Sequence, residues 1–161
     1  MTHFEELYTQ PNPEKSAWFR SAETAPDLVR GGGNQAHYLA TGATTGGLYG
    51  LYKWEMGAGP VGADPHFHRT FSESFYILTG TVQLFDGNEW IDGSVGDFVH
   101  VPPGSIHAFR NHSDAPASML IHFAPGAPRE DYFNNLGRLA EMSTEERAAF
   151  LVEHDNLYLP S

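Results

Sequence analysis

The stretch ADPHFHRTFSESFYILTG, residues 63–80, carries two histidines at alternate positions and then a glutamate, just before an apolar run that ends in glycine. Residues two apart in a strand face the same side of a sheet and lie roughly 6.6–7 Å apart, so His66 and His68 can approach one ion. Glu73 alternates with the apolar Phe75, which predicts that its carboxylate faces an apolar interior. A buried carboxylate is costly unless it is paired or binds a cation, so the stretch indicates a metal site.

The stretch GDFVHVPPGSIHAFRN, residues 96–111, supplies a further candidate ligand. Two apolar segments flank a Pro-Pro-Gly turn, and His107 alternates with Phe109 on the second segment, which predicts that its imidazole also faces the interior. Together with the first stretch, this makes three imidazoles and one carboxylate directed at one point. Such a set suits a divalent transition metal, and the chain has no cysteine that could supply a thiolate instead.

The composition limits the classes of partner and location. The chain has 161 residues, within the range of one domain, so we expect residues 1–161 to form a single unit. Its net charge of −11 would repel phosphate backbones, so we expect no nucleic-acid partner. The N-terminus has no signal-peptide pattern and no window approaches the roughly 18 apolar residues of a membrane span. We therefore expect no membrane association and a cytoplasmic location.

Short apolar segments separated by glycine and proline turns run from about residue 36 to 126. They predict about seven to nine short strands, a pattern that is typical of an all-β sandwich or barrel. Residues 1–35 are rich in proline and glycine, and we expect them to be irregular apart from one short helix near Thr2–Tyr8.

The segment of about residues 128–156 changes to helical spacing, with apolar residues three or four positions apart. Within it, Ser143 followed by Glu146 predicts a capping box, in which each side chain bonds the backbone N–H group of the other residue. We therefore expect two C-terminal α-helices that pack on the barrel.

The two histidine-containing stretches resemble the two characteristic motifs of the cupin superfamily. The first motif is matched, in order, by His66, His68, Glu73 and Gly80. The second motif is matched by Gly96, Pro102, Gly104, His107 and Asn111. One position departs from the pattern, because Pro60 stands where the first motif begins with a glycine that serves a turn and binds no metal. The resemblance covers about residues 40–125.

This resemblance implies an antiparallel double-stranded β-helix, the cupin or jelly-roll barrel, with one metal ion inside its wider end. In metal-containing cupins the ion is Mn, Fe, Ni, Co, Cu or Zn, and the matching ligands in this chain are His66, His68, Glu73 and His107. An octahedral ion would keep open positions for water, dioxygen or a chelating substrate. Because imidazoles bind metal only when neutral, affinity should fall as the pH drops through about 6 to 5. Cupins also pair through sheet edges, which implies a homodimer.

Four further residues are candidates for binding a small-molecule substrate. Trp54, Phe75 and Phe109 are expected in the core, and they could also line a pocket in the barrel. His122 lies in the last expected barrel strand, in phase with Leu120, and could approach the pocket as an acid–base group. The other histidines outside the two motifs are expected on the surface or in loops.

The stretches ATGATTGGLYGLYKWEM, residues 40–56, and PREDYFNNL, residues 128–136, resemble single-domain bacterial cupins grouped with quercetin 2,3-dioxygenase. This resemblance implies a metal-dependent dioxygenase that acts on a small aromatic or enolic substrate. In that role Glu73 is the catalytic residue, which accepts a proton from the substrate hydroxyl group.

Two alternatives stay open on the sequence. The first is a metal-dependent isomerase, lyase or polyketide cyclase that uses no dioxygen, because cupins include all of these. Phosphorylated sugars are disfavoured as its substrates, since Lys53 and Arg110 are the obvious cations in the barrel strands and both are expected to face outward. The second alternative is a non-catalytic cupin that binds a small molecule.

Overall fold

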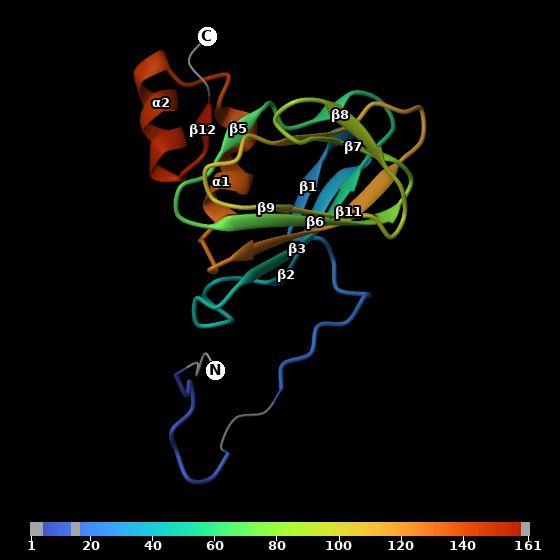
Figure 1. Cartoon of the computed structure of the whole chain (residues 1–161). Helices are drawn as coiled ribbons and strands as arrows, with labels where there is room; N and C mark the ends of the chain where they lie inside the picture. The colour runs from blue at the N-terminus through green and yellow to red at the C-terminus, as the bar shows by residue number, and fades with distance from the viewer. Residues whose placement is uncertain (1–4, 14–16, 159–161) are drawn as a thin grey trace.

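The computed structural model describes residues 5–13 and 17–158 (Figure 1). Residues 5–13 and 17–27 lie in no helix or strand. The helix expected near Thr2–Tyr8 is absent from residues 5–8, and residues 2–4 lie outside the described part of the chain. Three prolines interrupt this part of the sequence, and its large apolar side chains Leu7, Trp18 and Phe19 are mostly exposed rather than packed in the core.

The described chain folds into antiparallel sheets, which confirms the all-β prediction. The larger sheet has the strand order β1-β2-β3-β11-β6-β9. Its strands are β1 Leu28–Arg30, β2 Asn34–Ala40, β3 Gly50–Met56, β11 Ala117–Ala124, β6 Ser72–Thr79 and β9 Phe98–Val101. The second sheet has the order β4-β10-β7-β8, with β4 Val61–Gly62, β10 Ala108–Asn111, β7 Val82–Phe85 and β8 Trp90–Gly93. A short third sheet pairs β12 Leu157–Tyr158 with β5 His66–Phe67.

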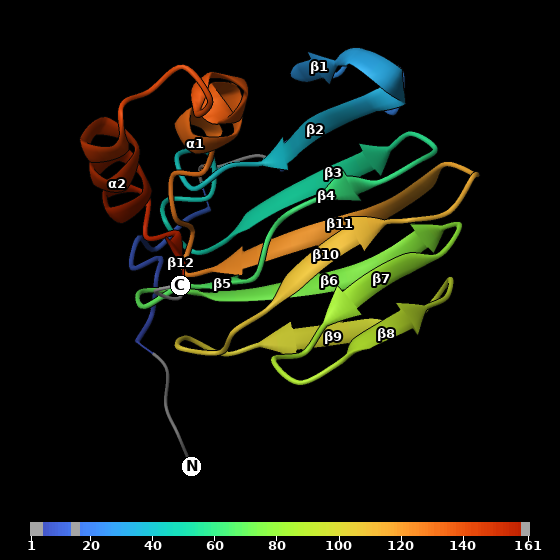
Figure 2. The same cartoon turned by 90° about the horizontal axis from the view of Figure 1, so that it is seen from above.

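The core lies between the two larger sheets, whose strands overlie one another when the molecule is seen from above (Figure 2). Alternate residues of β3, β6 and β11 point into it, as the period of two in a strand requires. The larger sheet contributes Tyr52, Met56, Phe75, Ile77, Met119, Ile121 and Phe123, and the second sheet contributes Val82, Leu84 and Phe109. These side chains are buried and pack as one cluster.

The barrel begins earlier than the start near residue 36 that the sequence predicts. Leu28–Arg30 already pairs with β2, and Gly31–Gly33 form the turn between these two strands. Gly32 and Gly33 have φ values of 73° and 84°, which residues with a side chain rarely adopt. The glycine run, expected as a plain loop, is therefore the turn of a hairpin.

The C-terminal segment contains the two expected helices, α1 Glu130–Asn135 and α2 Thr144–Glu153, with a short 3₁₀ turn, η2 Leu136–Arg138, between them. The capping box of Ser143 and Glu146 is confirmed at the start of α2. Helix α1 buries Tyr132 and Phe133 against the core, and both helices lie at the end of the barrel where β5 and β12 run (Figure 1). Among the described residues, no helix has the length and hydropathy that a membrane span requires.

Candidate metal centre

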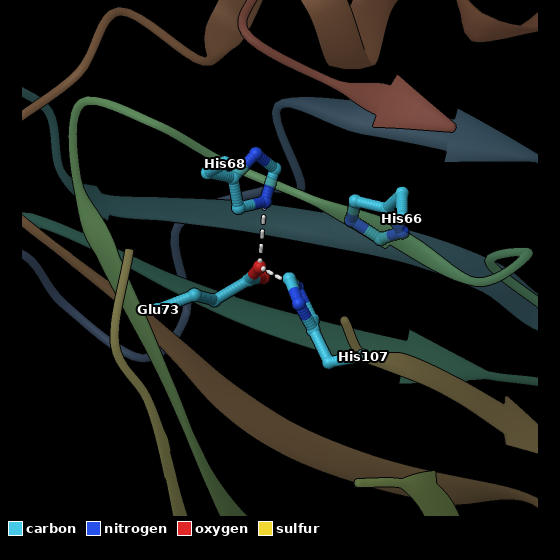
Figure 3. A group of neighbouring side chains, drawn as sticks. All are labelled: His66, His68, Glu73 and His107. Carbon is cyan, nitrogen blue, oxygen red and sulfur yellow. Dashed lines mark hydrogen bonds and ion pairs between the residues drawn. The ribbon is translucent and has the colours of Figure 1, made fainter. Parts of the chain in front are cut away.

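The structure brings together the four side chains that the motif spacing singled out (Figure 3). His66 is in β5, His68 follows it, Glu73 lies near the start of β6, and His107 immediately precedes β10. Each offers one ligand atom, all of these atoms lie within 4.8 Å of one another, and every member is at most 5% exposed.

Backbone hydrogen bonds hold the ligand-bearing segments side by side. His66 and His107 form an antiparallel bridge in which each N–H group donates to the carbonyl of the other, at 3.0 and 2.9 Å. The turn that precedes His107 also contacts the first motif, because the N–H group of Gly104 donates to the carbonyl of His68 at 2.6 Å. Gly104 has a φ of 85°, which explains why the Pro-Pro-Gly turn ends in glycine.

Each of the three imidazoles is oriented by a backbone carbonyl. The Nδ1–H groups of His66, His68 and His107 donate to the carbonyl oxygens of Asp64, Asp155 and Ser105, at 2.7, 2.5 and 3.0 Å respectively. A carbonyl oxygen only accepts, so Nδ1 carries the proton and Nε2 of the neutral ring carries a lone pair. Metal-binding histidines are typically held in this way, with the second ring nitrogen fixed from behind.

The position of Glu73 fits a cation within this cluster. Its Oε2 atom lies 3.0 Å from Nε2 of His68 and 2.7 Å from Nε2 of His107. If both rings are neutral, their Nε2 lone pairs face the carboxylate of Glu73. A carboxylate also only accepts hydrogen bonds, so these contacts have no donor. A divalent ion between the groups would remove this conflict, and three imidazoles with one carboxylate are a suitable donor set for it.

Burial and the carboxylate of Glu73 have different effects on the pKa values of the individual imidazole rings. Burial, with the nearby His107, lowers the pKa of His66 to about 3, so this ring stays neutral and available to a metal. Burial also opposes the charged form of His107, but the hydrogen bond and charge of Glu73 prevail and raise its pKa. Burial alone would raise the pKa of Glu73, yet its hydrogen bonds to His107 and His68 hold that pKa below the usual range.

A cavity of about 290 Å³ opens beside the cluster, and His66 and Glu73 form part of its wall. Trp54 and Phe109, both predicted to bind substrate, also line it. Phe75 is not part of this wall and lies beneath the site, with its ring centre 6.1 Å from that of His107 and 5.6 Å from that of Phe109.

The expectation for His122 needs correction. On β11 the residues that face the core are Met119, Ile121 and Phe123, so His122 lies on the opposite face of the sheet. There its ring stacks on Tyr49, with ring centres 5.7 Å apart, and it is not among the residues that line the cavity. Alternation along the strand agrees with this, because the phase of Met119, Ile121 and Phe123 is apolar throughout, whereas the phase of His122 also contains Ser118.

The cavity also contains cations that sequence reasoning missed. Lys53 and Arg110 are not part of its wall, but Arg30, Arg129 and Arg147 are. These three arginines come from β1, from the residue before α1 and from α2, which lie outside the two histidine motifs. Asn156, next to β12, also lines the cavity. No motif or periodic pattern marks these positions, because β1 and the C-terminal segment reach the site only through the tertiary fold.

A β-barrel that encloses a buried group of three histidines and a glutamate defines a protein with an internal site that could hold a metal. Residues 52–123 match the family described as Cupin domain. This part of the chain is therefore similar to the cupin family, as its two motifs predict.

The chain is also similar to several known proteins. The chain is 32% identical over 74 residues to quercetin 2,3-dioxygenase of Bacillus subtilis, a match that covers 45% of this chain and 21% of that enzyme. It is 27% identical over 126 residues to Protein SchB of Streptomyces halstedii, which covers 78% of this chain and 87% of that protein. Among solved structures, KdgF from Halomonas sp. superposes with a TM-score of 0.59 at 18% identity, over 73% of this chain and 99% of that one, and this shows the fold alone.

Proposed function

We propose that this cupin is a metal-dependent dioxygenase that acts on a small aromatic or enolic molecule. The observation that carries the proposal is that His66 and Glu73 belong both to the candidate metal cluster and to the wall of an aromatic-lined cavity. A molecule in the cavity would therefore lie beside the ion. The similarity to a quercetin 2,3-dioxygenase over 74 residues supports oxygen chemistry, although that match covers a small part of the enzyme.

Glu73 is the group suited to move a proton in this site. Its low pKa makes it a weak base toward an ordinary hydroxyl group. When bound, a divalent ion supplies Lewis acidity that lowers the pKa of a coordinated hydroxyl group, and it offers a position for dioxygen. Glu73 can then accept the proton at a carboxylate oxygen, while His66, His68 and His107 keep their orientation through their Nδ1–H hydrogen bonds.

The variant Glu73→Gln tests this role. It keeps an oxygen ligand of the same shape, so we expect most of the metal to remain, while turnover falls by about 100- to 10,000-fold. Oxygen uptake against a panel of flavonols and small diketones measures turnover, and metal analysis of the same samples measures occupancy. Equal activity in Glu73→Gln would remove its role as the base.

The double variant His68→Ala, His107→Ala is the matched control for the metal site. It removes two of the four candidate ligands, so we expect metal occupancy to be lost. Unchanged occupancy in this variant would contradict the site itself, independently of which reaction the protein catalyses.

A reaction without dioxygen is the second candidate function. The cavity contains arginines, so the reason for disfavouring phosphorylated sugars no longer holds. An isomerase, lyase or cyclase would use the ion to polarise a carbonyl group. Turnover under anaerobic conditions with zinc would favour this class over the dioxygenase. A purified protein that binds no metal and turns over none of these molecules would instead support a non-catalytic binding role.

A further inference from the structure

We propose that the substrate binds as an organic anion, with its carboxylate held by Arg129 and Asn156 and its apolar part against the aromatic wall of the cavity. This names the substrate class of the site described above, and so it rests on the proposed function.

Arg129 is a buried cation that has no anionic partner among residues 5–13 and 17–158. It is 2% exposed and is enclosed by aromatic rings, with its guanidinium carbon 4.2 Å from the ring centre of Tyr132. Nη1–H donates to the carbonyl of His154 at 2.6 Å and Nη2–H donates to Oδ1 of Asn156 at 3.1 Å. Among the described residues, none pairs its carboxylate with this guanidinium, and the Nε–H group has no hydrogen-bond partner.

Asn156 presents a second unpaired donor. Its Oδ1 atom accepts from Arg129, which determines how the amide is turned and directs the NH₂ group away from that contact. This side chain is 1% exposed, and its Nδ2 atom has no partner within the part of the chain that the structure describes. A buried donor without a partner is unfavourable, so two such donors on residues that line one cavity indicate a ligand that accepts hydrogen bonds.

The balance of buried charge also favours an anion. Among the described residues, Glu73 and Arg129 are the buried side chains that carry a full charge at neutral pH, and their charges cancel. A divalent ion bound by neutral imidazoles and Glu73 would leave this interior with two excess positive charges. Excess charge in a low-dielectric interior is strongly unfavourable, and an anionic substrate would offset it.

The size of the cavity restricts the apolar part of the substrate. About 290 Å³ is at the small end of the range of about 300–1,000 Å³ for ligand pockets. The wall offers Trp54, Phe109 and Phe133, so a flat apolar group fits its chemistry. A carboxylic acid with a single aromatic ring or a short enol therefore fits better than a flavonol of three rings.

Binding to the zinc-loaded full chain tests this inference without turnover. The probes are 2-hydroxybenzoate and its neutral amide, 2-hydroxybenzamide, measured by isothermal titration calorimetry. They share the ring and the hydroxyl group and differ in charge. We expect the benzoate to bind at least about 10-fold more tightly, because only the carboxylate offsets the charge of Arg129 and the ion.

Two variants locate the effect. Arg129→Met fills the aromatic enclosure without a charge, and we expect it to weaken benzoate binding by about 10- to 100-fold while the affinity for the amide and the zinc content stay the same. Asn156→Asp preserves the shape and places a carboxylate beside Arg129, so it should cause a similar loss even if Arg129→Met does not fold. Arg138→Met, on the exposed η2 turn, is the matched control and should bind both probes as the natural chain does.

The outcomes separate this inference from the proposed function. Equal affinity for the two probes, or unchanged benzoate binding in both variants, overturns the anion site even if the protein consumes oxygen with a neutral substrate. Selective benzoate binding that depends on Arg129 and Asn156 supports the anion site, and it does so even if no oxygen uptake is found and the dioxygenase proposal fails.

Discussion

His66 shows how burial changes the chemistry of a single side chain in the candidate metal centre. Its pKa is lowered from 6.5 to about 3 in the folded protein, so between these values the unfolded chain binds a proton that the folded chain does not. The free energy of unfolding of the metal-free protein should therefore fall as the pH drops below 6.5. The slope from this residue approaches about 1.4 kcal/mol per pH unit.

Urea unfolding at several pH values, with a chelator present, measures this slope. The variant His66→Gln has a neutral side chain at all of these pH values, so its unfolding free energy should depend less steeply on pH. A variant with the same slope as the natural chain would show that His66 is not responsible.

His107 has a raised pKa, so its proton competes with a metal ion already at pH values above 6.5. As the pH is lowered, metal affinity should therefore begin to fall before the pH reaches the range of about 6 to 5 that unperturbed imidazoles predict.

At the level of single residues, the sequence was most informative where spacing and chemistry agree. His66, His68, Glu73 and His107 lie in two short motifs whose strand phases converge, and the structure brings them together. His122 was misplaced because its phase was judged from Leu120 alone, although the opposite phase of the strand is apolar throughout. Arg129 and Asn156 lie outside any periodic pattern, so only the tertiary fold reveals that they reach the cavity.

The pairing of β5 with β12 links the C-terminal segment to the candidate metal centre. Asp155, just before β12, accepts hydrogen bonds at Oδ2 from the backbone N–H groups of Arg69 and Thr70 and from the Thr70 hydroxyl group, at 2.7–2.8 Å. Its carbonyl accepts the Nδ1–H group of His68. These contacts hold the turn between His68 and Glu73, so Asp155 acts as a positioning residue for His68.

Asp155→Ala should therefore weaken metal binding as well as stability. We expect zinc affinity to fall by about 10- to 100-fold, because the orientation of a ligand depends on the group behind it. Competition with a chromophoric chelator measures the affinity. Asp155→Asn is the matched control, since asparagine keeps an acceptor oxygen and tolerates the φ of 49° at this position, and it should retain more affinity than alanine. Equal affinities in both variants and the natural chain would contradict this role.

The strands differ in how well their sequences predict them. Residues 50–124 contain alternating apolar segments bounded by turns, and these segments form strands of both larger sheets. Strands β1 and β12 have three and two residues, too few for a periodic pattern, and β1 adjoins a glycine run that resembles a loop. Their pairing partners hold them in place, since β1 lies against β2 and β12 lies against β5.

At the scale of the whole molecule, the outer face of the six-stranded sheet suggests how two copies could associate. Phe98 is 62% exposed and lies beside Tyr76 in the register of β9 with β6. Both residues line a shallow hollow on this face, and none of the residues that line it is acidic. Most of the surface is expected to repel a second copy because the net charge is −11, so a hollow whose lining has no carboxylate is the favourable place for contact.

We therefore expect a homodimer, as the cupin resemblance implies, but one that forms through this face and not through a sheet edge. Phe98→Glu adds a charge at the centre of the contact and should convert the protein to a monomer, because like charges from both copies would face one another across the symmetric interface. Sedimentation velocity at micromolar concentration measures the change. Ile91→Glu, on β8 of the other sheet and 46% exposed in the natural chain, is the matched control and should remain dimeric. If Ile91→Glu dissociates and Phe98→Glu does not, the contact lies on the opposite sheet, and a natural chain that sediments as a monomer contradicts the dimer altogether.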